Sequence, residues 1–285
     1  MIISSKRLTK LIPGITIKKT FKDSGQKQVF LVNYGLYTNV ILKVVKPGNA
    51  RVEREIEIIT ENNIVNVPKI LEVINYQDDD PDLCFLLIFE EYIDGSDLRS
   101  FLEQRKLSSQ EGLKLLRDLL EITVQLENLK IVHRDIKPDN IILSNSGDFY
   151  LIDFGIARSL NATSLTFTEV AHGPHTPGYG PPELINYKKS EIDSRTDLYS
   201  IGVVAYEALA GKHPYISGNE SDLPEIWYAT QTVLPQDFFI EGDCENQLIS
   251  FIQILMDKYV TRRPPTAKKA LEWFNTVCKS LSVEV

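Results

Sequence analysis

The sequence has few cysteines and more negative than positive charge. Its three cysteines, Cys84, Cys244 and Cys278, are odd in number and far apart in the 285 residues. They therefore argue against a disulfide framework or a zinc site and favour reduced thiols in a cytoplasmic protein. Lysine and arginine total 31 against 39 acidic residues, a net charge of −8. We therefore expect no nucleic-acid partner and no binding to an anionic membrane surface.

Long apolar runs are also missing. The longest, CFLLIF and IGVVAY, are much shorter than a membrane span and are followed by acidic residues. The opening stretch, MIISSKRLTK, lacks the apolar core of a signal peptide, so no membrane anchor is expected. In contrast, 43% of the residues are hydrophobic, which is enough for packed globular cores.

The first part of the chain has the pattern of a small sheet that carries one helix. Residues 28–45, QVFLVNYGLYTNVILKVV, predict two strands around a turn at Tyr34 to Asn39. Residues 50–63 have helical composition and apolar spacing. KILEVINY and LCFLLIFEEY, which flank the acidic turn QDDDPD, predict two further strands.

The remaining sequence changes to helical patterns. Ser108 and Glu111 have the spacing of a capping box ahead of a long amphipathic helix. Residues 196–210 are apolar nearly all round and stop at Gly211, as a helix buried in a core would. NIIL and FYLI, on either side of SNSGD, predict a hairpin. The change of pattern makes Ile93 to Ser96 the expected hinge between two lobes.

A set of short motifs supplies the residue types that phosphoryl transfer requires. Transfer from ATP needs cationic groups at the phosphates, magnesium held by hard oxygen ligands, and a group that orients the attacking hydroxyl. HRDIKPDN supplies Asp135 and Asn140, and DFG begins at Asp153. Upstream, the predicted strand VILK ends at Lys43, and the predicted helix carries Glu55. HRDIKPDN alone has the composition of an ordinary turn, so the order of the motifs decides.

In this order the motifs resemble those of the eukaryotic-type (Hanks-type) serine/threonine protein kinase family. VILK resembles its strand lysine motif, HRDIKPDN its catalytic loop, DFG its magnesium motif and TPGYGPPE the end of its activation segment. DLYSIGVVAYE resembles its buried central helix and YVTRRPP its late arginine-proline element. The match runs from about Lys22 to the last helix of the sequence.

The resemblance implies an α+β, two-lobed protein kinase-like fold. A small antiparallel β-sheet lobe with one main helix would comprise residues 1–92, and a larger, mainly helical lobe would comprise residues 93–285. Together they would form one catalytic domain without a separate regulatory domain.

The resemblance also implies roles for individual residues. Lys43 would bind the α and β phosphates of ATP while paired with Glu55. Glu53 and Glu57 remain open as alternative partners, since one helical turn separates the choices.

In the catalytic loop, Asp135 would accept or orient the proton of the substrate hydroxyl. Lys137 would neutralise charge on the transferred group, and in the family a lysine here goes with serine/threonine specificity. Asn140 and Asp153 would hold Mg²⁺ against the phosphates.

The phosphate-covering loop departs from the family pattern GxGxxGxV. When Val29 is set at the valine, Lys22, Ser24 and Lys27 fall at the glycine positions, and only the neighbouring Gly25 is a glycine. Glycines let backbone amides approach phosphate closely, so ATP affinity or loop dynamics should be unusual. Positive charge on the two lysines would compensate in part.

The segment that follows the last predicted strand of the first lobe would bind adenine. By position, the backbone of Glu91 and Ile93 would make the hydrogen bonds. Glu90 stands where the family commonly has an apolar residue, and a buried carboxylate at that position needs a partner.

Two further roles are regulatory. Arg134 would help to form a cationic pocket for a phosphate on the activation segment. The expected phosphate acceptors are Thr166 and Thr168, with Ser159, Thr163 and Ser164 as alternatives, unless this stretch is simply a mobile polar loop. Thr176 would instead contact Asp135 and Lys137.

The remaining roles are structural. Glu183 and Arg263 would form a buried ion pair that ties the activation segment to the helical lobe, and Asp197 would cap backbone amides of the catalytic loop.

The sequence thus predicts an ATP- and Mg²⁺-dependent kinase that acts on serine and threonine of proteins, its own activation segment included. Self-association for phosphorylation between two copies would follow. A pseudokinase that serves as a scaffold is the alternative that the poor glycine loop suggests, although Lys43, Asp135 and Asp153 are all present. A small-molecule phosphotransferase would not be expected to combine HRDIK, TPGYGPPE and the arginine-proline element.

Overall fold

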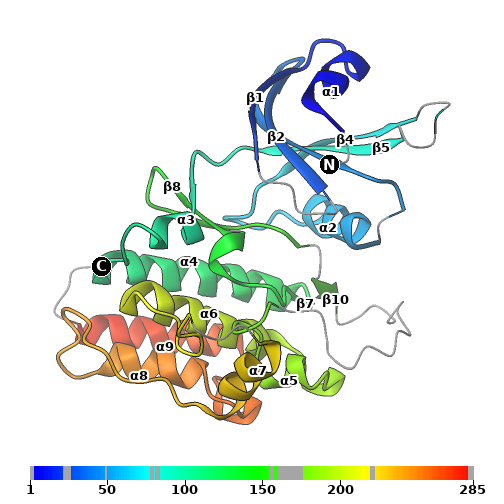
Figure 1. Cartoon of the computed structure of the whole chain (residues 1–285). Coiled ribbons are helices and arrows are strands. Elements are labelled where there is room, and N and C mark those ends of the chain that lie inside the picture. The colour runs from blue at the N-terminus through cyan, green and yellow to red at the C-terminus, as the bar shows by residue number, and fades with distance from the viewer. Residues whose placement is uncertain are drawn as a thin grey trace. The chain divides into compact units, whose positions relative to one another are not determined.

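The computed structural model describes residues 3–21, 27–48, 50–77, 80, 84–154, 157–159, 176–218 and 222–281. The chain forms two compact units, and Figure 1 labels their helices and strands. The first unit consists of residues 1–63 and 67–94, and the second of residues 64–66 and 95–285. The boundary therefore falls at Asp94 and Gly95, where the sequence suggested residues 92 and 93, and a three-residue loop belongs to the second unit.

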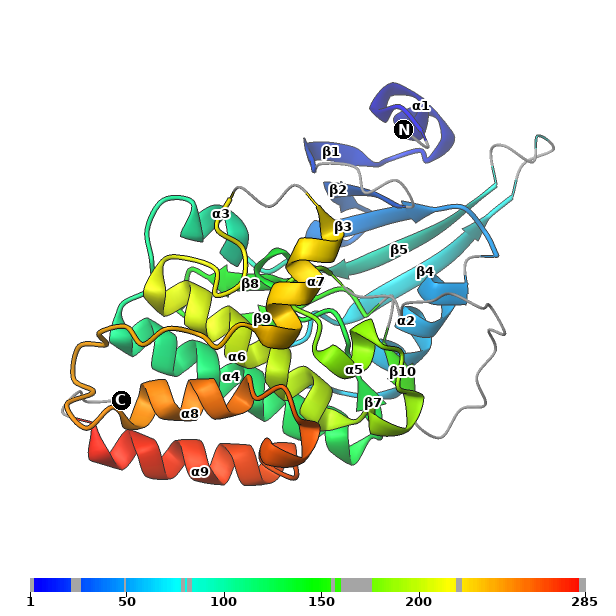
Figure 2. The same cartoon turned by 60° about the horizontal axis from the view of Figure 1, so that its bottom comes forward.

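A five-stranded antiparallel sheet forms the centre of the first unit, in the order β1-β2-β3-β5-β4 (Figure 2). Its strands are β1 (Thr16–Thr20), β2 (Lys27–Tyr34), β3 (Tyr37–Val45), β4 (Ile70–Tyr76) and β5 (Phe85–Glu91). The four strands predicted from the sequence are confirmed, although β3 begins inside the stretch predicted to be a turn. Strand β1 was not predicted.

The two faces of this sheet are covered by different helices. Helix α1 (Ser5–Leu11) packs through Leu8 on the face that carries alternate residues of β3 and β5, among them Leu42 and Leu87. Helix α2 (Ala50–Glu61) packs through Val52 on the opposite face, which carries Val45 and Ile88. Because side chains alternate along a strand, Lys43 and Glu90 share the face that α2 covers.

Helix α1 is the main departure from the predicted architecture, in which α2 was the one main helix of the first lobe. Ser4 caps α1, since its hydroxyl accepts a hydrogen bond from the Arg7 amide. Ile3, Leu8 and Ile12 are buried in the same cluster as the sheet residues. So short a helix is not stable by its own propensity, and burial of its apolar side stabilises it.

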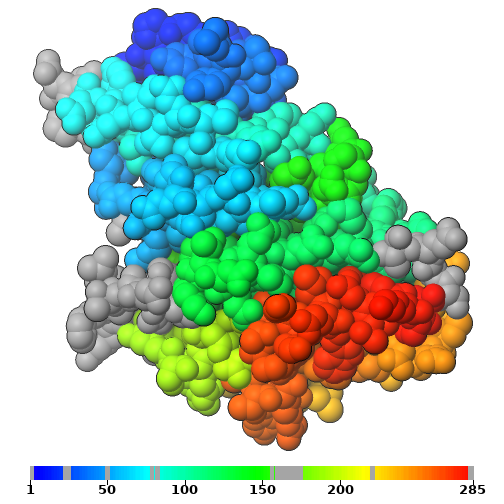
Figure 3. All heavy atoms as spheres, turned by 180° about the vertical axis from the view of Figure 1, so that it is seen from behind, coloured from blue at the N-terminus to red at the C-terminus, as the bar shows by residue number. Residues whose placement is uncertain are grey.

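The second unit is mainly helical, as predicted. Its α-helices are α3 (Leu98–Leu102), α4 (Ser109–Asn128), α5 (Pro182–Ile185), α6 (Ser194–Ala210), α7 (Leu223–Thr232), α8 (Gln247–Leu255) and α9 (Ala267–Ser280), and its short 3₁₀ turns are η2 (Pro138–Asn140), η3 (Lys189–Glu191) and η4 (Val260–Arg262). Helices α4, α6, α8 and α9 pack on one another. Figure 3 shows α9, in red, beside α4 on one face of this unit. Within the described ranges, every helix is too short or too polar to cross a bilayer.

The predicted ends of two helices are confirmed in atomic detail. The Ser108 hydroxyl accepts from the Glu111 amide at 3.3 Å, and the Glu111 carboxylate accepts from the Ser108 amide at 2.8 Å, which makes the capping box of α4. Helix α6 is buried on nearly every side and ends at Gly211, whose φ of +74° is the left-handed conformation that glycine adopts without strain.

Short strands frame the loop that carries HRDIKPDN. Strands β6 (Gly95–Asp97), β8 (Ile141–Ser144) and β9 (Phe149–Leu151) form a three-stranded sheet, and β7 (Ile131–Val132) pairs with β10 (Arg158–Ser159). The predicted hairpin is therefore β8–β9. Gly95 is required in β6 because a Cβ there would lie 2.1 Å from the carbonyl oxygen of Leu143. The catalytic-loop motif runs from β7 to β8, so both of its ends are fixed by strand pairing.

Candidate functional site

In the first unit, one buried lysine lies between two buried carboxylates. The Lys43 Nζ atom of β3 is 2.7 Å from Glu55 Oε1 of α2 and 2.7 Å from Glu90 Oε1 of β5. All three side chains are at most 10% exposed. Glu53 and Glu57, the alternative partners suggested by the sequence, have exposed side chains. Burial raises the pKa of Glu90, although the charge of Lys43 lowers it.

The other described residues of the first unit that the sequence predicted to bind nucleotide lie on or next to its strands. Val29 on β2 is half-buried and accepts a hydrogen bond at its carbonyl from the amide of Phe21. Lys27 begins the same strand, whereas Lys22, Ser24 and Gly25 lie outside the described residues. The Glu91 amide donates to the Lys69 carbonyl at 2.9 Å. Ile93 is 8% exposed.

In the second unit, Asp197 anchors the start of the catalytic-loop motif. Its carboxylate accepts from the amide of His133 at 2.8 Å and from the amide of Arg134 at 2.9 Å. Arg134 has a φ of +68°, a conformation that costs a non-glycine residue about 1–2 kcal/mol, and these two bonds help to hold it. Burial raises the pKa of Asp197 to about 7, against the lowering effect of the two amides. The cap of helix α6 itself is Asp193, so Asp197 serves the loop.

Three polar side chains converge on Asp135. Thr176 donates its hydroxyl to Asp135 Oδ1 at 2.6 Å, and Asn140 donates Nδ2 to Oδ2 at 3.0 Å. Lys137 Nζ lies 3.0 Å from the same Oδ2 and donates to the Thr176 hydroxyl at 2.7 Å. The Asp135 carboxylate is 15% exposed and is therefore oriented from several directions while one side stays open to solvent.

Asn140 and Asp153 are brought together by the backbone. The amide of Ile152, the residue before Asp153, donates to the Asn140 carbonyl at 2.9 Å. Because Asn140 uses Nδ2 for both of its bonds to Asp135, its Oδ1 is available as an oxygen ligand. Asp153 supplies a carboxylate at a left-handed position, φ +68°. One amide oxygen and one carboxylate fit a Mg²⁺ ion that takes its other ligands from phosphates and water.

The pair predicted from TPGYGPPE and YVTRRPP is fully buried. Arg263 binds Glu183 with both ends of its guanidinium, at 2.6 and 2.9 Å, and the two side chains are 0% and 1% exposed. Arg263 also donates to the carbonyls of Asp257 and Arg195, and the Thr196 hydroxyl donates to Glu183. The bidentate geometry and these additional bonds leave the buried charges well paired.

The sequence matches the model of the protein kinase domain over residues 34–274. The chain belongs to the protein kinase family. It is 30% identical over 232 residues to the serine/threonine-protein kinase cds1 of Schizosaccharomyces pombe, covering 79% of this chain and 48% of that protein. It is 29% identical over 211 residues to the serine/threonine-protein kinase atg1 of Dictyostelium discoideum, covering 73% and 30%. It is 38% identical over 156 residues to the serine/threonine-protein kinase PknL of Mycobacterium tuberculosis, covering 51% and 38%. The matched part thus spans less than half the length of each of these relatives.

The family match confirms the predicted two-lobed kinase fold, in which the first unit is the sheet lobe and the second the helical lobe. Most residues named in the regulatory predictions lie outside the described part of the chain. Arg134 is 8% exposed and lies beside Asp135 in the kinase catalytic loop. Thr166 and Thr168, together with Thr163 and Ser164, lie outside the described residues, as does the side chain of Ser159. A phosphate pocket at Arg134 stays a prediction.

A second polar cluster in the kinase domain was missed by sequence analysis. Arg99 of α3 donates to Glu207 of α6 at 2.7 Å and to the hydroxyl of Tyr179, which itself donates to Glu207 at 2.5 Å. Arg99 also lies 3.5 Å from Asp139 in the catalytic loop. Burial raises the pKa of Tyr179, so its hydroxyl stays protonated as a donor. The acidic Glu207 in the otherwise apolar C-terminal half of α6 was the available signal.

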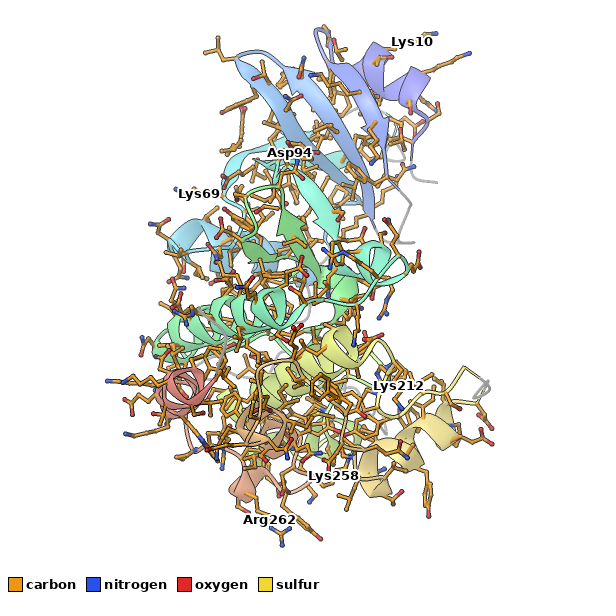
Figure 4. All side chains as sticks on the ribbon, turned by 90° about the vertical axis from the view of Figure 1, so that its left-hand side faces the viewer. Lys10, Lys69, Asp94, Lys212, Lys258 and Arg262 are labelled. Atoms are coloured by element: carbon orange, nitrogen blue, oxygen red, sulfur yellow. The ribbon has the colours of Figure 1, made fainter. Side chains whose placement is uncertain are left out.

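A half-buried lysine near the Glu183–Arg263 pair has an unusual setting. Lys258 Nζ lies 3.9 Å from the ring centroid of Tyr215 and 3.4 Å from the hydroxyl of Tyr199, and Figure 4 labels Lys258 in the second unit. Burial lowers the pKa of Lys258 to about 7, and the charge of Arg263 lowers it further while Asp257 raises it.

This setting predicts a pH-dependent stability. Between about pH 7 and 10.5 the unfolded chain keeps a proton on Lys258 that the folded chain has lost, so the free energy of unfolding should rise with pH. Lys258→Met removes this contribution. The melting temperature of the wild type minus that of Lys258→Met should therefore increase when the pH is raised from about 6.5 to about 9. A melting-temperature difference that is the same at both pH values would contradict the buried lysine.

Proposed function

We propose that the chain transfers the γ-phosphate of ATP to serine and threonine hydroxyls of protein substrates. The observation that carries this proposal is the convergence of Lys137, Asn140 and Thr176 on the Asp135 carboxylate. The hydroxyl of Thr176 donates to Asp135 Oδ1 at 2.6 Å, and Oδ1 has a second lone pair. The same carboxylate can therefore orient a substrate hydroxyl.

In the proposed reaction, the substrate oxygen forms a bond to the γ-phosphorus while the bond to the bridging oxygen of ADP breaks. The hydroxyl proton passes to Asp135, which later releases it to solvent. The Lys137 ammonium, which now lies between Asp135 and Thr176, would neutralise charge that develops on the transferred group. Orientation and charge compensation are the main contributions that a protein makes to phosphoryl transfer.

The nucleotide contacts belong to the same proposal. Lys43, held by Glu55, would bind the α and β phosphates, and the backbone of Glu91 and Ile93 would bind adenine. Lys27 and Val29, with Lys22, Ser24 and Gly25 outside the described part, would form the loop over the phosphates. Mg²⁺ bound at Asn140 Oδ1 and Asp153 would neutralise phosphate charge.

Serine/threonine specificity is proposed on two grounds. Lys137 stands two positions after the catalytic aspartate, and the similar proteins described above are named serine/threonine-protein kinases. Protein substrates and phosphorylation between two copies of the chain follow from that proposal. A cytoplasmic location is proposed because Cys84, Cys244 and Cys278 form no disulfide with one another.

The test is phosphate transfer from γ-labelled ATP in the presence of Mg²⁺. The purified chain is incubated with and without a general kinase substrate such as myelin basic protein, and labelled residues are located by mass spectrometry. Label is expected on serine and threonine, only with Mg²⁺, and not with the variant Asp153→Ala. Label on tyrosine alone would contradict the specificity. Saturating nucleotide binding without any transfer would contradict the activity and support the pseudokinase alternative.

A further inference from the structure

The pair of carboxylates around Lys43 is more than the kinase site requires. A lysine paired with one glutamate is a neutral unit, whereas Lys43, Glu55 and Glu90 together carry one excess negative charge if all are ionised. The Glu55 and Glu90 side chains are 3% and 8% exposed, so little solvent screens the group. Burying an excess charge lowers the stability of the fold, so we expect this charge to support a function.

The two carboxylates are attached to the sheet in different ways. Glu90 belongs to β5, which pairs directly with β3 through Ile41 opposite Glu90 and Lys43 opposite Ile88. Lys43 and Glu90 are therefore diagonal neighbours on one sheet face, a relation fixed by the strand register. Glu55 belongs to helix α2, whose position depends on side-chain packing through residues such as Val52 and Ile56. A shift of α2 would remove Glu55 from Lys43 but would leave Glu90 in place.

We propose that Glu90 is a second, strand-fixed anchor of Lys43, which holds the ammonium in position for nucleotide when Glu55 is withdrawn. Glu90 is a positioning residue in this scheme, since it acts through Lys43. The inference rests on the proposed ATP-dependent function for its effect on nucleotide binding. The kinase would then depend less on the Lys43–Glu55 pair than a domain with an apolar residue at position 90 would.

The anchor should act only as a carboxylate. Among the described residues, the charged groups that act on Glu90 are Lys43 from β3, Glu55 from α2 and Lys27 from β2. A protonated Glu90 would still accept a hydrogen bond from Lys43 but would lose the ionic attraction. In Glu55→Gln, where Glu90 still contacts Lys43, nucleotide affinity should therefore fall on acidification more steeply than in the wild type.

The test is a double-mutant cycle with Glu55→Gln, Glu90→Gln and the double variant, all close in shape to the wild type. Affinity for a non-hydrolysable ATP analogue with Mg²⁺ is measured by titration, and kcat and KM for ATP are measured where transfer occurs. Each single variant should lose at most about tenfold in affinity, and the double variant should lose at least about tenfold more than the product of the two single losses. Glu57→Gln, on the same helix but exposed, is the matched control and should be unchanged.

The proposal fails if Glu55→Gln alone is as weak as the double variant, or if the two losses simply multiply. It also fails if acidification weakens Glu55→Gln no more than the wild type. These outcomes are separate from failure of the proposed function, since nucleotide binding is measured without transfer. If the wild type binds no nucleotide, the same double-mutant cycle is measured on the free energy of unfolding in urea. There the two substitutions should be strongly non-additive because they share Lys43, and additive unfolding free energies would overturn the proposal.

Discussion

Replacing Asp135 with asparagine should lower kcat about a thousandfold and leave the KM for ATP close to the wild-type value. Asparagine has nearly the same shape, but its single amide oxygen can accept either from Thr176 or from Lys137 and Asn140, and it cannot take up the proton of the attacking hydroxyl. General-base contributions of this kind are typically about 10²- to 10⁴-fold. Steady-state kinetics with ATP and a protein or peptide substrate measure both constants, and thermal unfolding checks that the fold is intact.

The control for this prediction lies in the same loop. Asp139→Asn changes an aspartate whose side chain is 52% exposed and whose ion pair with Arg99 is long at 3.5 Å. Its kcat should stay within about twofold of the wild type, since exposed ion pairs contribute little. If Asp135→Asn keeps more than a tenth of wild-type kcat, another group must take the proton, and the assignment of Asp135 is wrong.

How much of the site could be read from the sequence depends on the distance along the chain between its members. Asp135, Lys137 and Asn140 lie within one loop, so their spacing alone indicated a common site. Arg99 meets Tyr179 and Glu207, which are 80 and 108 positions further along the chain. No local pattern relates such residues, because only the packing of α3 near the catalytic loop and α6 brings them together.

Two features of the first unit show the same limit. The sequence indicated that a buried Glu90 would need a partner, but the resemblance had paired Lys43 with Glu55. Only the strand register and the packing of α2 show that Lys43 forms ion pairs with both carboxylates. Helix α1 was missed because seven residues give a weak periodicity, and the burial that stabilises the helix comes from the sheet. In both cases the deciding interaction is tertiary.

Replacing Arg263 with methionine should cause the largest loss of stability among these variants. The substitution leaves the carboxylate of Glu183, 1% exposed, without its bidentate partner. Breaking a buried pair by removing one member costs about 3–5 kcal/mol. In a protein of this size the melting temperature should fall by about 5–8 °C. Differential scanning calorimetry, supported by urea unfolding, measures the change.

Two further variants separate loss of the pair from loss of packing. Glu183→Met combined with Arg263→Met removes both charges, and it should recover a large part of the lost stability, since apolar replacements of buried pairs are often tolerated. Lys269→Met breaks an exposed pair between the Lys269 and Glu272 side chains, which are 62% and 48% exposed, and should leave the melting temperature nearly unchanged. If Arg263→Met is no more harmful than Lys269→Met, the Glu183–Arg263 pair does not hold the end of the activation segment to the helical lobe. Activity should then be as heat-resistant in that variant as in the wild type.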